Sequence, residues 1–98
     1  MITIEQIKEL AKDRKPGGLG KQVRLATEHV VISIVGGERG LYGDFEDDFE
    51  VAIIDRETDQ FVTNHFYPEL NDDVIGYLPK EKLVELVMKV TKGNFQVL

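Results

Sequence analysis

One mostly apolar segment constrains the fold more than any other feature of this sequence. Residues 30–35 read VVISIV, and the β-branched residues in this run favour a strand. A strand that is apolar on both faces is expected where a sheet is covered on two sides or where the strand has neighbours on both edges. Val23 to Thr27, just before it, predicts a short strand or an extended approach. The connection that follows is expected to be flexible, because it contains Gly36, Gly37, Gly40 and Gly43.

The segment that precedes these strands has the features of a helix. Thr3 and Gln6 have the spacing of a capping box, in which the hydroxyl and the amide each bond a free backbone N–H. Apolar residues then repeat at helical spacing at Ile4, Ile7, Leu10 and Ala11, which predicts a helix over residues 4–14. Pro16-Gly17-Gly18 is expected to end this helix.

A second amphipathic helix is predicted near the other end, in the segment PKEKLVELVMKV. Pro79 suits a first helical position, and Leu83, Val87 and Val90 share one stripe. Gly93 lies where a C-cap is expected. The tail NFQVL is expected either to add an edge strand or simply to pack against the rest.

The region between these parts predicts a hairpin followed by an irregular stretch. FEVAIID and QFVTNHFY are separated by the polar residues RETD, which is typical of two strands joined by a short turn. PELNDDVIGYL has no clear period. It is expected to be either a functional loop or a short helical turn capped by Asp72 or Asp73.

Together these elements predict one α+β domain over residues 1–98. We expect a three- or four-stranded antiparallel sheet flanked by an N-terminal and a C-terminal amphipathic helix, because each helix needs the sheet to bury its apolar stripe. The length of 98 residues suffices for one core, and an apolar content of 42% argues against disorder.

The stretch YGDFEDDFEVAII gives the clearest hint of function. Asp44, Glu46, Asp48 and Glu50 occupy every second position, so a strand here would carry four carboxylates on one face. The other face would carry Phe45, Phe49, Val51 and Ile53. Three interpretations stay open. Lys12, Arg14, Lys15, Lys21 and Arg24 could neutralise the carboxylates internally, the charges could protect a sheet edge from aggregation, or the face could dock a basic partner.

Charge is segregated along the chain, whose net charge is −6. Acidic residues concentrate in the middle, between a basic N-terminal segment and a basic C-terminal one. An acidic middle repels nucleic acid, so direct DNA or RNA binding is not expected, and a basic protein surface is the expected partner. Mimicry of nucleic acid would need more charge than these four carboxylates supply. Carboxylates at every second position of a strand are spaced about twice as widely as the phosphates of one DNA strand.

Four further residues are candidates for partner binding. Tyr67 and Tyr77 flank the irregular stretch, and tyrosine is enriched at protein interfaces. Asp72 and Asp73 lie between them and would add two carboxylates to an acidic binding surface. Buried tyrosines with satisfied hydroxyl groups are the ordinary alternative.

The sequence offers little for catalysis or metal binding. Cysteine is absent, and PGGLGKQ departs from a phosphate-binding loop because Lys15 and Gln22 stand where glycine and Ser or Thr are needed. Ser33 is the only serine and lies mid-strand. His29 and His65 have no metal-ligand spacing. We therefore expect no cofactor, no metal site and no enzymatic activity.

The leading hypothesis is a small acidic, non-enzymatic interaction protein, in its sharpest form an inhibitor of a nucleic-acid-acting enzyme. The alternatives are a subunit that self-associates through an edge strand or helix face, and a small metal-dependent enzyme using His29 or His65. No apolar run of about 18 residues is present and no signal peptide is apparent, so we expect a cytoplasmic protein without a membrane segment.

Overall fold

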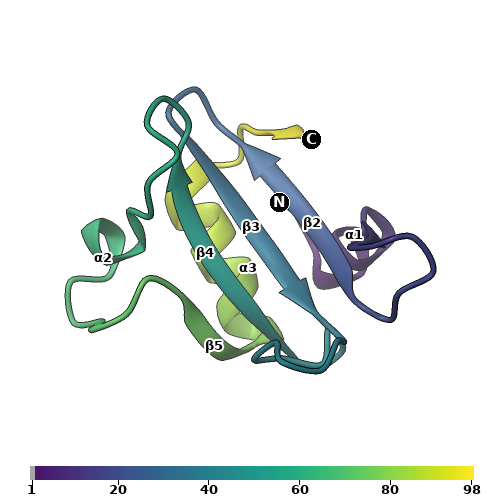
Figure 1. The fold of residues 1–98 in the computed structure, drawn as a ribbon. Coiled ribbons are helices and arrows are strands. Elements are labelled where there is room, and N and C mark those ends of the chain that lie inside the picture. Colours follow the sequence, from purple (N-terminus) through teal and green to yellow (C-terminus); the bar gives the residue numbers. More distant parts are fainter. Residues whose placement is uncertain (1) are drawn as a thin grey trace.

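Six antiparallel strands form one sheet in the computed structural model, which describes residues 2–98 (Figure 1). The strands are β1 (Lys12–Asp13), β2 (Lys21–Ala26), β3 (Val30–Gly36), β4 (Asp48–Asp55), β5 (Ile75–Pro79) and β6 (Gln96–Val97). The helices are α1 (Ile4–Glu9), α2 (Thr63–Phe66) and α3 (Lys80–Thr91). The predicted α+β class with an antiparallel sheet is confirmed, but the sheet has more strands than the three or four predicted.

The strand order is β1-β2-β3-β4-β5, and β6 also pairs with β2. β1 and β6 share the outer edge of β2, since β1 pairs with Lys21 and Gln22 while β6 pairs with Leu25 and Ala26. The tail therefore adds an edge strand, which was one of its two predicted outcomes. β3 lies between β2 and β4, so its apolar sequence reflects neighbours on both edges.

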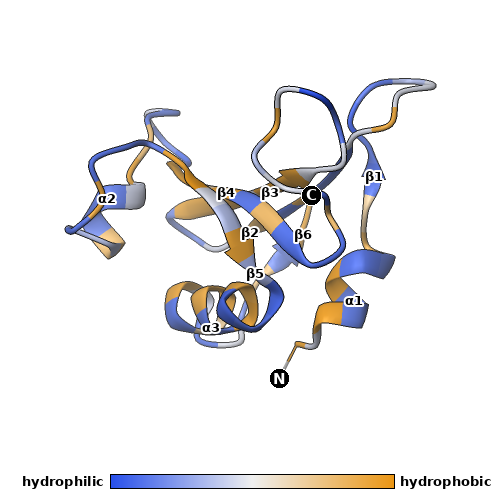
Figure 2. Cartoon of the chain, turned by 90° about the horizontal axis from the view of Figure 1, so that it is seen from below, coloured by the Kyte–Doolittle hydropathy of each residue, from blue (hydrophilic) through white to orange (hydrophobic). Residues whose placement is uncertain are grey.

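Alternation along the strands separates the two faces of the sheet. The buried face is made by Val23, Leu25, Ile32, Ile34, Phe49 and Val51. α3 packs Leu83 and Val87 into this core and α1 adds Ile7. Figure 2 shows α1 and α3 on the same side of the sheet. The opposite face carries the cross-strand row Arg24, Ser33 and Ala52.

The first helix begins as predicted but ends earlier. Thr3 and Gln6 form the predicted capping box, with the Thr3 hydroxyl accepting from the Gln6 N–H at 3.2 Å. The helix stops at Glu9 instead of continuing to residue 14. The reason is that Lys12 and Asp13 pair with β2, and a residue cannot serve a helix and a sheet ladder at once.

The predicted hairpin after β4 is wrong in its second half. Beyond one bridge between Ile54 and Phe61, the chain leaves the sheet and forms the short helix α2. Thr63 explains the departure, since its Oγ1 accepts the Ile53 N–H at 2.9 Å and donates to the Asp73 carbonyl at 2.7 Å. The threonine side chain thus replaces the backbone partner that a second strand would have supplied.

The irregular stretch contains a strand that its sequence pattern does not reveal. Residues 75–79 form β5 along β4, with a register shift between Phe49 and Val51, and no helical turn is capped by Asp72 or Asp73. Pro79 is the N-cap of α3, not its first residue. At the other end Lys92, with φ of 54°, takes the C-cap position predicted for Gly93. None of the helices formed by residues 2–98 is long and apolar enough to cross a bilayer.

Candidate functional site

Residues 44–48 form a closed turn, here called the acidic loop, at the start of β4. Oδ1 of Asp44 accepts the backbone N–H groups of Glu46 at 2.8 Å, Asp47 at 2.9 Å and Asp48 at 3.2 Å. In return, Oδ1 of Asp48 accepts the Asp44 N–H at 2.9 Å. The loop is therefore held in one shape by its own side chains, without help from a partner.

These N–H groups also determine the charge of Asp44. The donors at Glu46, Asp47 and Asp48 lower the pKa of its carboxyl from the usual 3.8 to about 2, against a small opposing effect of desolvation. Hydrogen bonds to the ionised form favour ionisation. Asp44 therefore stays negative at any physiological pH.

Phe45 anchors the acidic loop to the core. Its φ is 62°, a left-handed conformation, and its side chain is buried against Phe49, with ring centroids 5.0 Å apart and planes at 73°. The close fit depends on glycine, because a Cβ at Gly36 would lie 2.8 Å from the Phe45 nitrogen. Buried edge-to-face aromatic pairs add about 0.5–1.5 kcal/mol beyond their area.

The predicted four-carboxylate strand is therefore wrong. β4 begins at Asp48, so Asp44 and Glu46 lie in the acidic loop and only Asp48 and Glu50 lie on the strand. The side chain of Asp44 binds the N–H groups that a strand would have offered to a neighbour. Short polar side chains compete with secondary structure in this way. The carboxylates still cluster, but around a turn.

Internal neutralisation of this cluster is partial. Lys8 pairs with Glu46 at 3.2 Å and Lys80 with Asp47 at 3.5 Å. Within residues 2–98, no ion pair reaches Asp44, Asp48 or Glu50. Three of the five basic residues predicted to neutralise the carboxylates pair elsewhere, Arg14 and Lys15 with Glu38 and Lys21 with Asp13.

Glu38 takes up the basic charge of the N-terminal connection instead. Its carboxylate accepts from Arg14 at 2.7 Å and lies 3.6 Å from the Lys15 ammonium. The hydrogen bond from Arg14 is the main cause that lowers the pKa of Glu38. This pairing joins the loop before β2 to the loop after β3 and leaves the acidic loop without those two cations.

Two exposed tyrosines adjoin the acidic loop. Tyr77 is 62% exposed and Tyr42 is 52% exposed, and their ring centroids are 5.9 Å apart at 56°. The Tyr77 N–H donates to the Tyr42 carbonyl at 2.7 Å, and the Tyr42 N–H donates to Oε1 of Glu50 at 3.2 Å. These bonds connect β5, the loop after β3 and the N-terminal part of strand β4.

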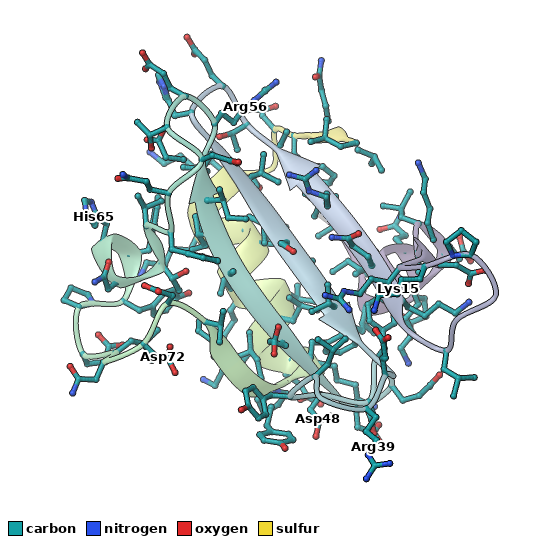
Figure 3. All side chains as sticks on the ribbon, viewed as in Figure 1. Lys15, Arg39, Asp48, Arg56, His65 and Asp72 are labelled. Carbon is teal, nitrogen blue, oxygen red and sulfur yellow. The ribbon has the colours of Figure 1, made fainter. Side chains whose placement is uncertain are left out.

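The other predicted site residues lie elsewhere. Figure 3 shows Asp72 near α2 and Asp48 at the far end of the sheet. Tyr67 is half-buried against the core, and Nζ of Lys89 lies 4.1 Å from its ring centroid. Burial raises the pKa of Tyr67, with smaller contributions from Glu85 and Glu69. Asp44, Glu46, Asp48, Glu50 and Tyr77 therefore lie in one region, and Tyr67, Asp72 and Asp73 lie outside it.

The sequence interpretation missed Tyr42, Asp47, Lys8 and Lys80. Asp47 and Lys80 belong to runs of charged residues that are visible in the sequence, and Lys8 lies on the predicted first helix. Tyr42 has no such signal, since its position depends on the irregular pairing of β4 with β5.

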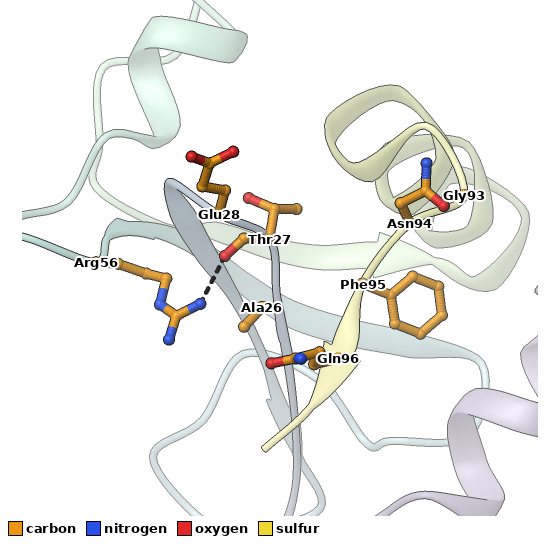
Figure 4. A pocket seen from close by; sticks show the side chains of 8 residues that line it. All are labelled: Ala26, Thr27, Glu28, Arg56, Gly93, Asn94, Phe95 and Gln96. Atoms are coloured by element: carbon orange, nitrogen blue, oxygen red, sulfur yellow. Dashed lines mark hydrogen bonds between the residues drawn. The ribbon is translucent and has the colours of Figure 1, made fainter.

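Among residues 2–98, no group of three or more His, Asp or Glu side chains is placed to hold a metal ion. A depression of about 500 Å³ lies at the opposite end of the sheet from the acidic loop and is lined by residues including Thr27, Glu28, Arg56 and Asn94 (Figure 4). Arg56 donates there to the Thr27 carbonyl at 2.8 Å.

No protein-family model, curated protein or solved structure matches this chain. A functional proposal therefore rests on the chemistry of the residues described above.

Proposed function

We propose that this chain is a binding module that docks a basic surface of another protein on its acidic loop and on Tyr42 and Tyr77. One observation carries the proposal: fixed carboxylates at Asp44, Asp48 and Glu50, without ion pairs inside the described residues, adjoin two exposed aromatic rings. Carboxylates at a rim provide attraction at long range, and tyrosines provide contact area at short range.

The geometry of the acidic loop favours fast and specific docking. Its shape is set by the bonds to Asp44, so little conformational entropy is lost when a partner binds. Side chains of Glu46 and Asp47 are 73% and 80% exposed, so both carboxylates stay available to a partner despite their lysine neighbours. Surface ion pairs of this kind are weak, at about 0–1 kcal/mol, and exchange readily.

The sharpest form of the proposal is an inhibitor that covers the nucleic-acid-binding surface of an enzyme. Such surfaces carry clustered Lys and Arg, and the acidic middle of this chain has the complementary sign. Self-assembly through an edge strand has less support. The outer edge of β2 is occupied by β1 and β6, and β5 is irregular and ends in a proline.

A charge-matched pair of variants tests the proposal. Glu46→Gln, Asp47→Asn and Glu50→Gln together remove three charges at the site while leaving Asp44 to hold the loop. The control combines Glu28→Gln, Glu57→Gln and Asp59→Asn, which remove three charges at the other end of the sheet. A third variant combines Asp72→Asn with Asp73→Asn and tests the two carboxylates that lie near α2.

Each variant is used as bait for a lysate of the source organism at low and at high salt. A basic protein captured by the parent, released by salt and bound about tenfold more weakly by the site variant alone supports the proposal. Release of that protein by added duplex DNA or RNA supports the inhibitor form. Equal capture by the site variant and the parent overturns the role of the acidic loop.

A further inference from the structure

Tyr42 and Tyr77 form an exposed aromatic pair that the fold holds at some cost. Tyr77 has φ of 51°, and the left-handed conformation costs a non-glycine residue about 1–2 kcal/mol. Gly76 allows the pair to form, since a Cβ there would lie 2.9 Å from the Cβ of Tyr42. Burial does not repay this cost, because Tyr77 is 62% exposed. Local strain at an exposed, ordered side chain is a reason to look for a binding role.

A comparison within the molecule indicates what the pair would bind. The ring face of Tyr67 is already occupied by the ammonium of Lys89, 4.1 Å from the ring centroid. No cation of residues 2–98 lies over Tyr42 or Tyr77 in the same way. Cations are attracted to the face of an aromatic ring, and a carboxylate nearby adds a charge-assisted hydrogen bond to the same cation.

Glu50 provides such a carboxylate. Its Oε1 accepts the Tyr42 N–H at 3.2 Å, so the side chain is held next to the tyrosine pair. Its other oxygen has no hydrogen-bond partner within the described residues. A guanidinium group suits this combination better than an ammonium, since it is planar, stacks on a ring and still presents N–H groups at its edge. The 5.9 Å between the two ring centroids is too short for a group to enter between them, so it would stack on an outer face.

We propose that Tyr42 and Tyr77 form the binding site for an arginine side chain of the basic partner, with Glu50 as the carboxylate that pairs with the guanidinium. This inference rests on the proposed function, because it names the partner group that this same surface recognises. It adds a preference that charge alone does not supply, since the acidic loop attracts lysine and arginine equally.

Two peptides of equal length and charge test the inference, one of alternating Gly and Arg and one of alternating Gly and Lys. Binding of each is followed by NMR through the backbone amides and the tyrosine ring protons. The variants are Tyr77→Leu and Tyr42→Leu, which remove a ring but keep apolar bulk, and Tyr77→Phe, which keeps the ring. Unchanged amide signals in the parts of the sheet distant from Tyr42 and Tyr77 establish that each variant is folded.

The arginine peptide is expected to bind about threefold to tenfold more tightly than the lysine peptide and to shift the ring signals of Tyr42 and Tyr77. Tyr77→Leu and Tyr42→Leu should remove this preference, whereas Tyr77→Phe should keep it. Equal binding of both peptides, with shifts confined to the acidic loop at residues 44–48, overturns the arginine site and leaves the proposed docking function standing. Absence of shifts with either peptide at millimolar concentration overturns both.

Discussion

Phe45 and Tyr77 share a left-handed backbone conformation, with φ of 62° and 51°, although Phe45 is 5% exposed and Tyr77 is 62% exposed. Both residues carry the same type of backbone strain, but only at Phe45 is the cost offset by burial of the ring in the core. The strain at Phe45 is therefore explained by stability. The strain at Tyr77 is not, and it fits a residue placed for contact with a partner.

Glycine substitutions at these two positions should change stability by very different amounts. Phe45→Gly should lower the free energy of unfolding by about 3–5 kcal/mol, the usual cost of removing a buried aromatic side chain. Tyr77→Gly should stay within about 1 kcal/mol of the parent, because relief of strain offsets the lost contact with Tyr42. Urea unfolding measures both. A large loss of stability in Tyr77→Gly would show that the tyrosine pair supports the fold.

Asp44 should make stability depend on pH in the acid range. Because its pKa falls from 3.8 to about 2 on folding, the stabilisation is fully present above the unfolded value. It is lost as pH falls from about 3.8 through about 2. Asp44→Asn should melt at a lower temperature than the parent near neutral pH. The difference between the two melting temperatures should become smaller as the pH falls through this range. Asp47→Asn is the control, since Asp47 accepts only from Lys80, and its difference from the parent should be small throughout.

Thr63→Val should destabilise the protein by about 1–3 kcal/mol, because it leaves the buried Ile53 N–H and the Asp73 carbonyl without their partner. Valine keeps the shape of the side chain, so the loss reports the hydroxyl group. Thr58→Val is the matched control at an exposed position and should stay within about 0.5 kcal/mol. Urea unfolding gives both values, and hydrogen exchange at Ile53 shows whether the N–H has been freed.

Tyr67 should ionise above its ordinary pKa of 10.0, mainly because burial disfavours the phenolate. Stability contributed by this group is fully present below 10.0 and is lost as pH rises through the folded pKa. The ultraviolet absorbance of tyrosinate, compared between the parent and Tyr67→Phe, isolates this residue. A titration of Tyr67 at or below 10.0 would show that the ring is more open to solvent than its packing indicates.

Sequence patterns predicted the elements whose signals are local. The capping box of α1, the apolar run of β3 and the stripe of α3 each depend on residues within a few positions of one another. Two of the failures arose where a side chain took over a backbone role. Asp44 binds the N–H groups of a predicted strand, and Thr63 takes the partner of Ile53. Such substitutions are invisible to a pattern of apolar and polar residues.

The candidate site was predictable only in part, for a related reason. Its carboxylates were identified from their positions at every second residue, though on a strand that does not form at Asp44 or Glu46. Tyr42 was missed because its neighbour Tyr77 lies on β5, whose pairing with β4 includes a register shift. Contacts that depend on such irregular pairing over a long sequence separation leave no trace in either segment.

The pairing of β6 with β2 has a consequence for how the molecule assembles. Leu25 pairs with Val97, so this ladder closes residues 25–97 into a loop, and loop closure becomes less favourable as the loop lengthens. β6 has only two residues, both exposed, with which to offset that entropy. We therefore expect β6 to join the sheet after the core of β2, β3, β4 and α3 has formed. It should also be the first part to detach, so its amides should exchange with solvent well before those of β3.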